Sequence, residues 1–161
     1  MVMTHRLPDL NMSVEIVLAE KAAEKGQAPF PVELIVFEED TSLVLSAGNF
    51  MRDIRQETSE LVQEMSHFEP LVRGTVVRKG QRLYAIVHDL DQEPACDKQS
   101  VRQALDEIMR ICIETKVRSI AIEPLGCVHG HLDRDWFLQQ LEESAAASSL
   151  QRIWVSLPPA V

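Results

Sequence analysis

The sequence predicts an α/β fold in which a sheet is covered by crossover helices. From Ser13 onward, short runs rich in apolar and β-branched residues alternate with longer segments of helical periodicity. Residues 32–37 are apolar on both faces except for Glu33, which is typical of a strand inside a sheet. No linker or repeat divides the 161 residues, and 45% apolar content is enough for one core. We therefore expect one domain over 13–161 after a flexible arm at 1–12.

The first half of the chain begins with the strand candidate SVEIVL at 13–18, and a short helical piece then ends at Gly26. Four later apolar residues fall on one side at helical spacing: Phe50, Ile54, Leu61 and Met65. They predict an amphipathic helix over 49–66. The segment EEDTSLVLSAGN at 38–49 has features of both a strand and a helix cap, and we interpret it as a loop that enters this helix.

The second half begins with two predicted strands, 71–77 and 81–90, joined by a close turn at Gly80. Five apolar residues at helical spacing follow them: Val101, Ala104, Leu105, Ile108 and Cys112. They predict a long helix over 98–115.

The end of the chain repeats the strand and helix order. RSIAIEPL reads as a strand that stops at Pro124, and DRDWFLQQLEESAA as a helix with Asp133 as its N-cap. IWVSL at 153–157 is the last predicted strand. The expected order is β α β α β β α β α β.

Charge and cysteine content exclude several classes of partner. The net charge is −9, which opposes binding to double-stranded nucleic acid through its phosphates. A small anion is still allowed, because a helix N-terminus and backbone N–H groups bind phosphate without a basic surface. Three widely spaced cysteines indicate a reducing compartment. No run reaches the ~18 apolar residues of a membrane span, so we expect a cytoplasmic protein with no membrane contact.

Three stretches of the second half resemble a macro domain, the fold known for binding ADP-ribose. They are RGTVVRKGQRLYAIVHDLD, RSIAIEPLGCVHGHLDRDWFLQQL and IWVSLP. The resemblance implies a three-layer α/β/α sandwich with a mixed central sheet. It also implies that His88 matches the family's histidine near a strand end. The loop LGCVHGHL matches the family loop that wraps the diphosphate and distal ribose, which implies ligand contacts at Gly126, Cys127, Val128, His129 and Gly130.

The first half resembles the family more faintly. Asp40 stands where the family has a catalytic or ribose-contacting asparagine, and Gly48 alone is left of its glycine cluster, so we expect Gly48 to contact the ligand. A carboxylate at position 40 would repel a diphosphate by ~4 kcal/mol at ~4 Å and an effective dielectric near 20. We therefore expect a degenerate pocket for ADP-ribose or a related phosphate-bearing nucleotide metabolite.

The loop from Gly126 to Gly130 follows a strand directly and precedes a helix. Loops at the carboxyl ends of strands line the ligand crevice of open α/β sheets, and orphan N–H groups at a helix start favour an anion. We expect the main-chain amides of 126–130 to point outward into open space. The alternative is a tight turn.

Side chains in the same loop allow other chemistry. A run of four potential ligands could hold a metal: His129, His131, Asp133 and Asp135. We predict no metal, because the ligands come from one short loop and Asp133 is already explained as a cap. We predict no cofactor either. Cys127 near a helix N-terminus would have a lowered pKa and could act as a nucleophile with His129 or His88 as its base; the alternative is a small residue that fills a corner.

Three functions are consistent with these patterns. The first is a binding module for ADP-ribose or a related nucleotide, without predicted catalysis. The second is a macro-like scaffold without a ligand that acts in protein interaction or forms a homo-oligomer. The third is an ADP-ribosyl or phosphoester hydrolase, for which Asp40, Cys127 and His129 are the candidate catalytic residues.

Overall fold

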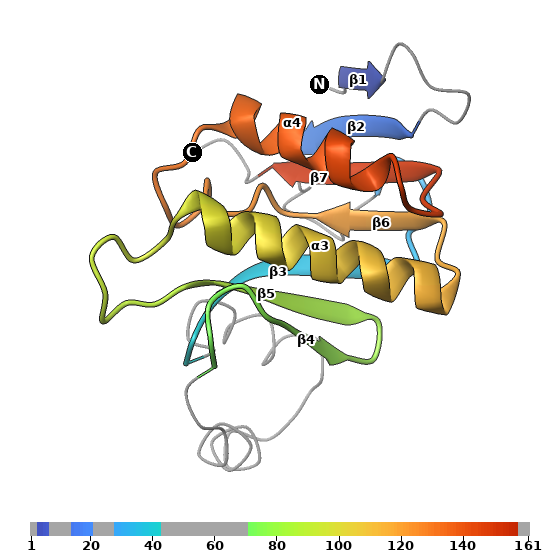
Figure 1. The fold of residues 1–161 in the computed structure, drawn as a ribbon. Helices are drawn as coiled ribbons and strands as arrows, with labels where there is room; N and C mark the ends of the chain where they lie inside the picture. Colours follow the sequence, from blue (N-terminus) through green and yellow to red (C-terminus); the bar gives the residue numbers. More distant parts are fainter. Residues whose placement is uncertain (1–2, 7–13, 21–27, 43–70, 158–161) are drawn as a thin grey trace.

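A seven-stranded mixed sheet forms the centre of the computed structural model, which describes residues 3–6, 14–20, 28–42 and 71–157. The strands, in chain order, are β1 Met3–Arg6, β2 Glu15–Glu20, β3 Leu34–Asp40, β4 Val76–Lys79, β5 Arg82–His88, β6 Ser119–Ile122 and β7 Arg152–Leu157. Their spatial order is β1-β2-β7-β6-β3-β5-β4 (Figure 1).

The five central strands, from β2 to β5 in the spatial order, run parallel. β1 and β4 pair antiparallel at the two edges, and β4 forms a hairpin with β5 through Gly80, whose φ is 62°. Because the central strands are parallel, their carboxyl ends all lie at the same edge of the sheet. We call this the carboxyl edge.

Two described helices, α3 Lys98–Thr115 and α4 Arg134–Ala145, lie side by side on one face of the sheet (Figure 1). Each begins at an aspartate whose carboxylate accepts a hydrogen bond from an amide of the first turn. Asp97 accepts from Ser100 N at 2.8 Å, and Asp133 accepts from Trp136 N at 3.1 Å. α3 ends at Lys116 in the left-handed conformation, with φ of 57°.

Apolar side chains are buried on both faces of the sheet. The large cluster beneath the helices includes Leu105, Ile108 and Phe137. The opposite face carries two further clusters, one around Tyr84 and one around Trp154. A sheet buried on both faces is the central layer of a three-layer α/β/α sandwich.

Most local predictions of the second half are confirmed, but the strand expected at 71–77 is β4 at Val76–Lys79, and residues 71–75 form no strand. The helix over 98–115, the Gly80 hairpin, the strand before Pro124, the Asp133 cap and the final strand all form. Among the described residues, no helix is long and apolar enough to cross a bilayer.

Three predictions of the first half are wrong. Residues 3–6, expected in a flexible arm, form β1 and pair with β2. β3 does not end at residue 37 but continues through Glu38, Glu39 and Asp40, since its pairing with β5 extends to the partners Asp40 and His88. The helical piece predicted at 19–26 is wrong at its start, because Ala19 and Glu20 belong to β2. Its remainder, the predicted helix at 49–66 and Gly48 lie outside the described residues.

Candidate functional site

A cavity of about 540 Å³ opens at the carboxyl edge, between two loops. One is the β5–α3 loop, residues 89–97, and the other is the β6–α4 loop, residues 123–133. The cavity is lined by His88, Glu93, Pro94, Ala95, Cys96, Asp97, Lys98, His129, Gly130, His131 and Leu132. Its volume is in the range of small-molecule sites, and its place at the carboxyl ends of parallel strands is where α/β sheets bind ligands.

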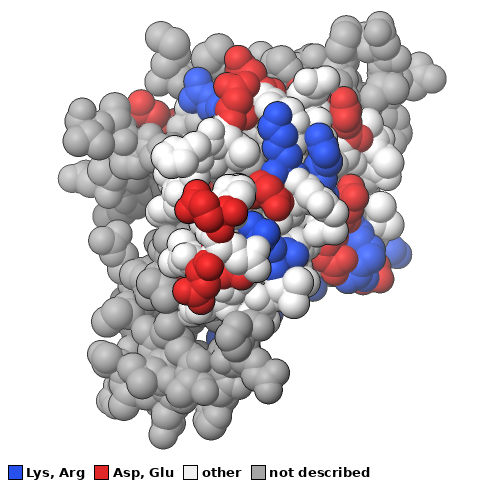
Figure 2. All heavy atoms as spheres, turned by 60° about the vertical axis from the view of Figure 1, so that its left-hand side comes forward, with Lys and Arg blue, Asp and Glu red and all other residues white. Residues whose placement is uncertain are grey.

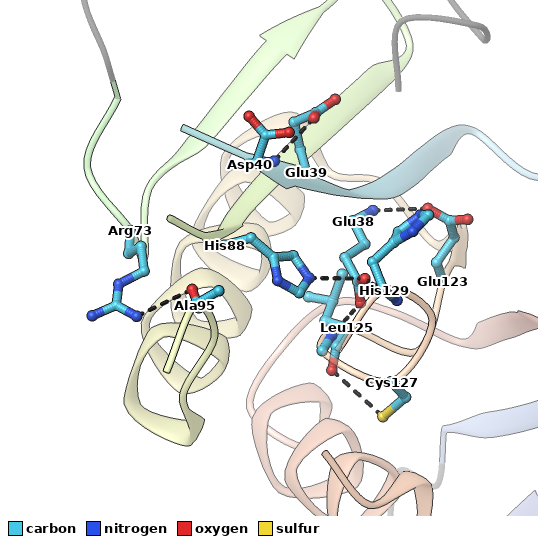
Figure 3. A network of polar contacts seen from close by, with 11 residues as sticks. Glu38, Glu39, Asp40, Arg73, His88, Ala95, Glu123, Leu125, Cys127 and His129 are labelled. Atoms are coloured by element: carbon cyan, nitrogen blue, oxygen red, sulfur yellow. Dashed lines mark hydrogen bonds and ion pairs between the residues drawn. The ribbon is translucent and has the colours of Figure 1, made fainter. Parts of the chain in front are cut away.

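Glu38 is the buried centre of the contacts beneath this cavity (Figure 3). The residue is 1% exposed and lies near the end of β3. Its Oε1 accepts a hydrogen bond from Gly126 N, and its Oε2 accepts one from His129 N at 2.7 Å. A buried carboxylate needs several donors to offset its lost hydration, and two amides of the β6–α4 loop supply them.

His88 provides a third contact to Glu38, from the end of β5. Its Nε2 lies 2.9 Å from Oε2 of Glu38, which is an ion-pair distance, although the contact lacks the geometry of a hydrogen bond. The side chain is 2% exposed, and His88 is one of the residues that line the cavity. The His129 ring approaches edge-on, with centroids 6.4 Å apart.

Backbone conformation and close contacts require glycine at both glycine positions of the β6–α4 loop. Gly126 has φ of 80°, a conformation that side-chain-bearing residues rarely adopt. At Gly130 a Cβ atom would lie 2.5 Å from the carbonyl oxygen of Gly126 and 3.1 Å from Cε1 of His88. The backbone therefore folds back on itself and on the His88 ring, and only glycine fits at either position.

The prediction that all amides of 126–130 point outward is wrong at three of the five positions. Gly126 N and His129 N donate to Glu38, and Cys127 N donates to the carbonyl of Pro124 at 3.0 Å. Within the described residues, the amides of Val128 and Gly130 have no acceptor. Three amides of this stretch are thus paired within the protein, and two have no acceptor among the described residues.

The two thiols near the cavity are poor nucleophiles. Burial, then the nearby charge of Glu38, raises the pKa of Cys127 to about 11 and that of Cys96 to about 12. Cys127 Sγ also donates to the carbonyl of Leu125 at 3.6 Å. The expectation of a lowered Cys127 pKa is therefore wrong, because an adjacent carboxylate and burial outweigh the helix N-terminus.

The other candidate residues fall in different places. Asp40 is fully buried, its Oδ1 accepts from Ser42 N at 2.6 Å, and it is not among the cavity-lining residues. His129 and His131 are exposed and line the cavity, whereas Asp133 serves as the α4 cap. The structure thus brings together His88, His129 and Gly130 but separates Asp40 from the cavity wall.

Arg73 contacts the β5–α3 loop from the segment before β4. Its guanidinium donates to the carbonyls of Pro94 at 3.0 Å and Ala95 at 3.2 Å, and it lies 3.5 Å from a carboxylate oxygen of Asp97.

Figure 2 shows the distribution of charge on one face of the molecule. Lysine and arginine side chains on that face lie among aspartates and glutamates rather than in one basic patch.

Sequence reasoning did not single out Glu38. The available signal was the acidic triplet EED directly after an apolar strand, where the strand meets the carboxyl edge. A carboxylate at that place is either solvated or engaged by a neighbouring loop, and the sequence contains nothing that decides between the two.

Solved structures show the same fold. A mutant of the Oceanobacillus iheyensis macrodomain matches with TM-score 0.71 and 16% identity, covering 99% of this chain and 90% of that chain. The macrodomain of Thermus aquaticus DarG matches with TM-score 0.62 and 20% identity, covering 88% and 98%. The macrodomain of Mycobacterium tuberculosis DarG matches with TM-score 0.64 and 18% identity, covering 89% and 98%.

The chain therefore has the macro domain fold, a divergent version of it. At these identities the likeness establishes the fold alone. No family sequence model matches the chain, and no curated protein matches it by sequence.

Proposed function

We propose that the protein is a binding module for a phosphate-bearing nucleotide metabolite, ADP-ribose or a relative of it, at the carboxyl edge. The observation that carries this proposal is the β6–α4 loop, in which Val128 and Gly130 present amides without an acceptor among the described residues. Two neighbouring main-chain N–H groups in a glycine loop near a helix start can donate hydrogen bonds to a phosphate oxygen. Such a site needs no basic surface.

Two fold neighbours support the choice of ligand class. Structures of the Oceanobacillus iheyensis macrodomain include one with ADP, at TM-score 0.67 and 12% identity, and one of a mutant with ADPR, at TM-score 0.60 and 12% identity. Those ligands belong to that protein. Here they indicate which nucleotides to test first.

Glu38 supports binding rather than opposing it in this proposal. Two amides and His88 surround its carboxylate, so its charge is largely met from within the protein. The same contacts fix the loop before a ligand arrives, and a pre-ordered loop loses less conformational entropy on binding. Glu38 then acts as a positioning residue for the amides of Val128 and Gly130.

Calorimetric titration with ADP-ribose, ADP and inorganic phosphate tests this function. Val128→Pro removes the free N–H and keeps an apolar side chain, whereas Val128→Ala keeps the N–H and serves as the matched control. We expect Val128→Pro to weaken nucleotide binding about tenfold, the effect of one charge-assisted hydrogen bond, and Val128→Ala to bind like the parent. Absence of heat with all three ligands, or equal affinities for both variants, would contradict the proposal.

A second candidate function is a macro-like scaffold without a ligand, for protein interaction or self-association. It is favoured by the same Glu38 contacts, since an internal carboxylate already occupies two amides of the loop. Light scattering across a concentration series tests it. A strict monomer that binds nucleotide would remove this candidate.

A further inference from the structure

We propose that the protein forms a symmetric dimer in which part of the β5–α3 loop of one copy binds the first turns of α3 and α4 of the other. The part that binds, residues 90–93, is called the loop tip. The surface that it contacts, called the Trp136 patch, consists of Lys98, Arg102 and Trp136. The inference does not rest on nucleotide binding, and it assigns a surface to the self-association raised above as part of the second candidate function.

The Trp136 patch presents two positive charges that no described carboxylate neutralises. Lys98 and Arg102 lie one turn apart on α3, and Lys98 Nζ and Arg102 Cζ lie 5.2 Å and 5.5 Å from the Trp136 ring centroid. Arg102 Nε also donates to Gln140 Oε1 on α4 at 3.3 Å. Among the described residues, neither cation has a carboxylate within ion-pair distance. Arginine and tryptophan are enriched among the residues that contribute most to protein interfaces.

The loop tip carries the opposite charge around an apolar side chain. Leu90 is 58% exposed. Asp91 and Glu93 are exposed beside it, and neither carboxylate has a partner within the described part of the chain. The loop tip is nevertheless held in place, because Arg73 Nη2 donates to Gln92 Oε1 at 2.8 Å. A loop that is already ordered loses less conformational entropy on binding.

The two surfaces are complementary in charge and in apolar character. In the dimer, Leu90 packs on the half-buried Trp136 ring of the other copy. The two carboxylates of the loop tip then lie beside the two cations of the Trp136 patch. Within one molecule these groups form no ion pair, and the β5–α3 loop extends past the start of α3 (Figure 1). A second copy therefore satisfies charges that one molecule leaves in solvent.

The position of the two surfaces favours a closed dimer over an open chain of copies. α3 and α4 both begin at the carboxyl edge, where the β5–α3 loop also lies (Figure 1). The loop tip and the Trp136 patch are close together, since α3 begins at Lys98, directly after this loop. A two-fold axis through the carboxyl edge lets each copy contribute both surfaces, so the contact forms twice and closes.

Two features oppose the dimer and limit its strength. The net charge of −9 repels a second copy at long range. At physiological ionic strength, however, exposed charges more than about 8 Å apart are largely screened, whereas partly buried pairs in contact are screened much less. A loop on a patch, formed twice, buries less surface than a standard interface, so we expect a reversible dimer with a Kd of the order of 100 µM.

Sedimentation velocity of the full chain without nucleotide tests the dimer. Concentrations from about 10 µM to about 1 mM, at about 0.15 M salt, bracket the expected Kd. We expect the mean sedimentation coefficient to rise across this range. A strict monomer throughout overturns the inference and leaves the nucleotide function standing. A dimer that binds no ADP-ribose removes the nucleotide function alone.

Two charge-reversed variants test whether these surfaces meet. Lys98→Glu with Arg102→Glu reverses the Trp136 patch, and Asp91→Lys with Glu93→Lys reverses the loop tip. Each variant alone joins like charges at both contacts, so we expect dimerisation about tenfold weaker or less. A one-to-one mixture restores it, because both contacts of the mixed dimer then join opposite charges. Variants that dimerise like the parent, or a mixture that stays monomeric, overturn the inference.

Leu90→Ser tests the apolar contact, and Ile113→Ser is its matched control. Ile113 is 50% exposed and lies near the other end of α3, away from the carboxyl edge. We expect Leu90→Ser to weaken dimerisation about tenfold or more, as removal of a central interface side chain does. Ile113→Ser should dimerise like the parent. Equal effects of the two variants would place the interface elsewhere and overturn the inference.

Discussion

The two loops of the carboxyl edge are each held by one charged side chain from a distant segment, but the two side chains differ in sign and burial. Glu38 is fully buried and collects amide donors of the β6–α4 loop. Arg73, with its side chain 20% exposed, collects carbonyl acceptors of the β5–α3 loop. In both loops, one charged side chain makes hydrogen bonds with several main-chain groups.

The difference in burial determines how much each set of contacts contributes to the free energy of unfolding. Removing a buried charged group leaves its donors without solvent or partner, whereas water can replace a guanidinium that is partly exposed. The β6–α4 loop should therefore depend strongly on Glu38, and the β5–α3 loop only weakly on Arg73. Variants in each loop test this contrast.

Glu38→Ala should have the largest effect. It leaves the amides of Gly126 and His129 without their acceptor and removes the ion-pair partner of His88, which costs about 3–5 kcal/mol of unfolding free energy by analogy with broken buried pairs. Urea unfolding measures the loss.

Glu33→Ala is the matched control for Glu38→Ala. Glu33 precedes β3, and its carboxylate also accepts from two amides, Arg118 N at 2.6 Å and Ser119 N at 3.2 Å, but it is exposed. Its removal should cost about 1 kcal/mol or less. Equal losses in the two variants would mean that burial does not explain the contrast.

Gly130→Ala should be next. The added Cβ would lie 2.5 Å from the carbonyl oxygen of Gly126, so the loop backbone must move, at a cost of about 1–3 kcal/mol. Thermal unfolding measures the cost, and Gly80→Asn, at a turn where a Cβ meets nothing within 4 Å, should change stability far less. If Gly130→Ala did not change thermal stability, the backbone at Gly130 could not be packed as closely against Gly126 as the structure shows.

Arg73→Met should cost about 1 kcal/mol or less, because the Arg73 side chain is partly exposed and water can reach its carbonyl partners once the guanidinium is removed. The local effect should be clearer than the global one. Hydrogen exchange of Asp89 N, which donates to the carbonyl of Ala95 at 2.7 Å, should accelerate as the β5–α3 loop opens. A global loss equal to that of Glu38→Ala would reverse the comparison.

The smallest effect concerns one thiol from each loop. With pKa values of about 11 for Cys127 and about 12 for Cys96, both thiols are protonated below pH 10 and become reactive thiolates only above it. At pH 8 roughly one Cys127 in a thousand is ionised, so alkylation should be slow and rise about tenfold per pH unit. Glu38→Gln should speed both reactions, since Glu38 raises both pKa values; unchanged rates would contradict that cause.

Features that depend on residues close together in the sequence could be predicted, whereas features that depend on distant residues could not. The helix over 98–115 and the Asp133 cap depend on residues a few positions apart, and periodicity and cap chemistry predicted them. The role of Glu38 depends on Gly126, which is 88 positions away, so no local pattern carries it. The pKa of Cys127 could not be predicted for the same reason. The sequence showed the nearby helix start but not the burial of the thiol or its closeness to the Glu38 carboxylate.

The central claim is that Glu38 fixes the β6–α4 loop and leaves the amides of Val128 and Gly130 for a ligand phosphate. An amide chemical-shift titration with ADP-ribose tests it most directly. The account predicts that the Val128 and Gly130 amide signals move and saturate together, while those of Gly126 and His129 keep their positions. Movement centred on Gly126 and His129, or no movement in the loop at all, would contradict it.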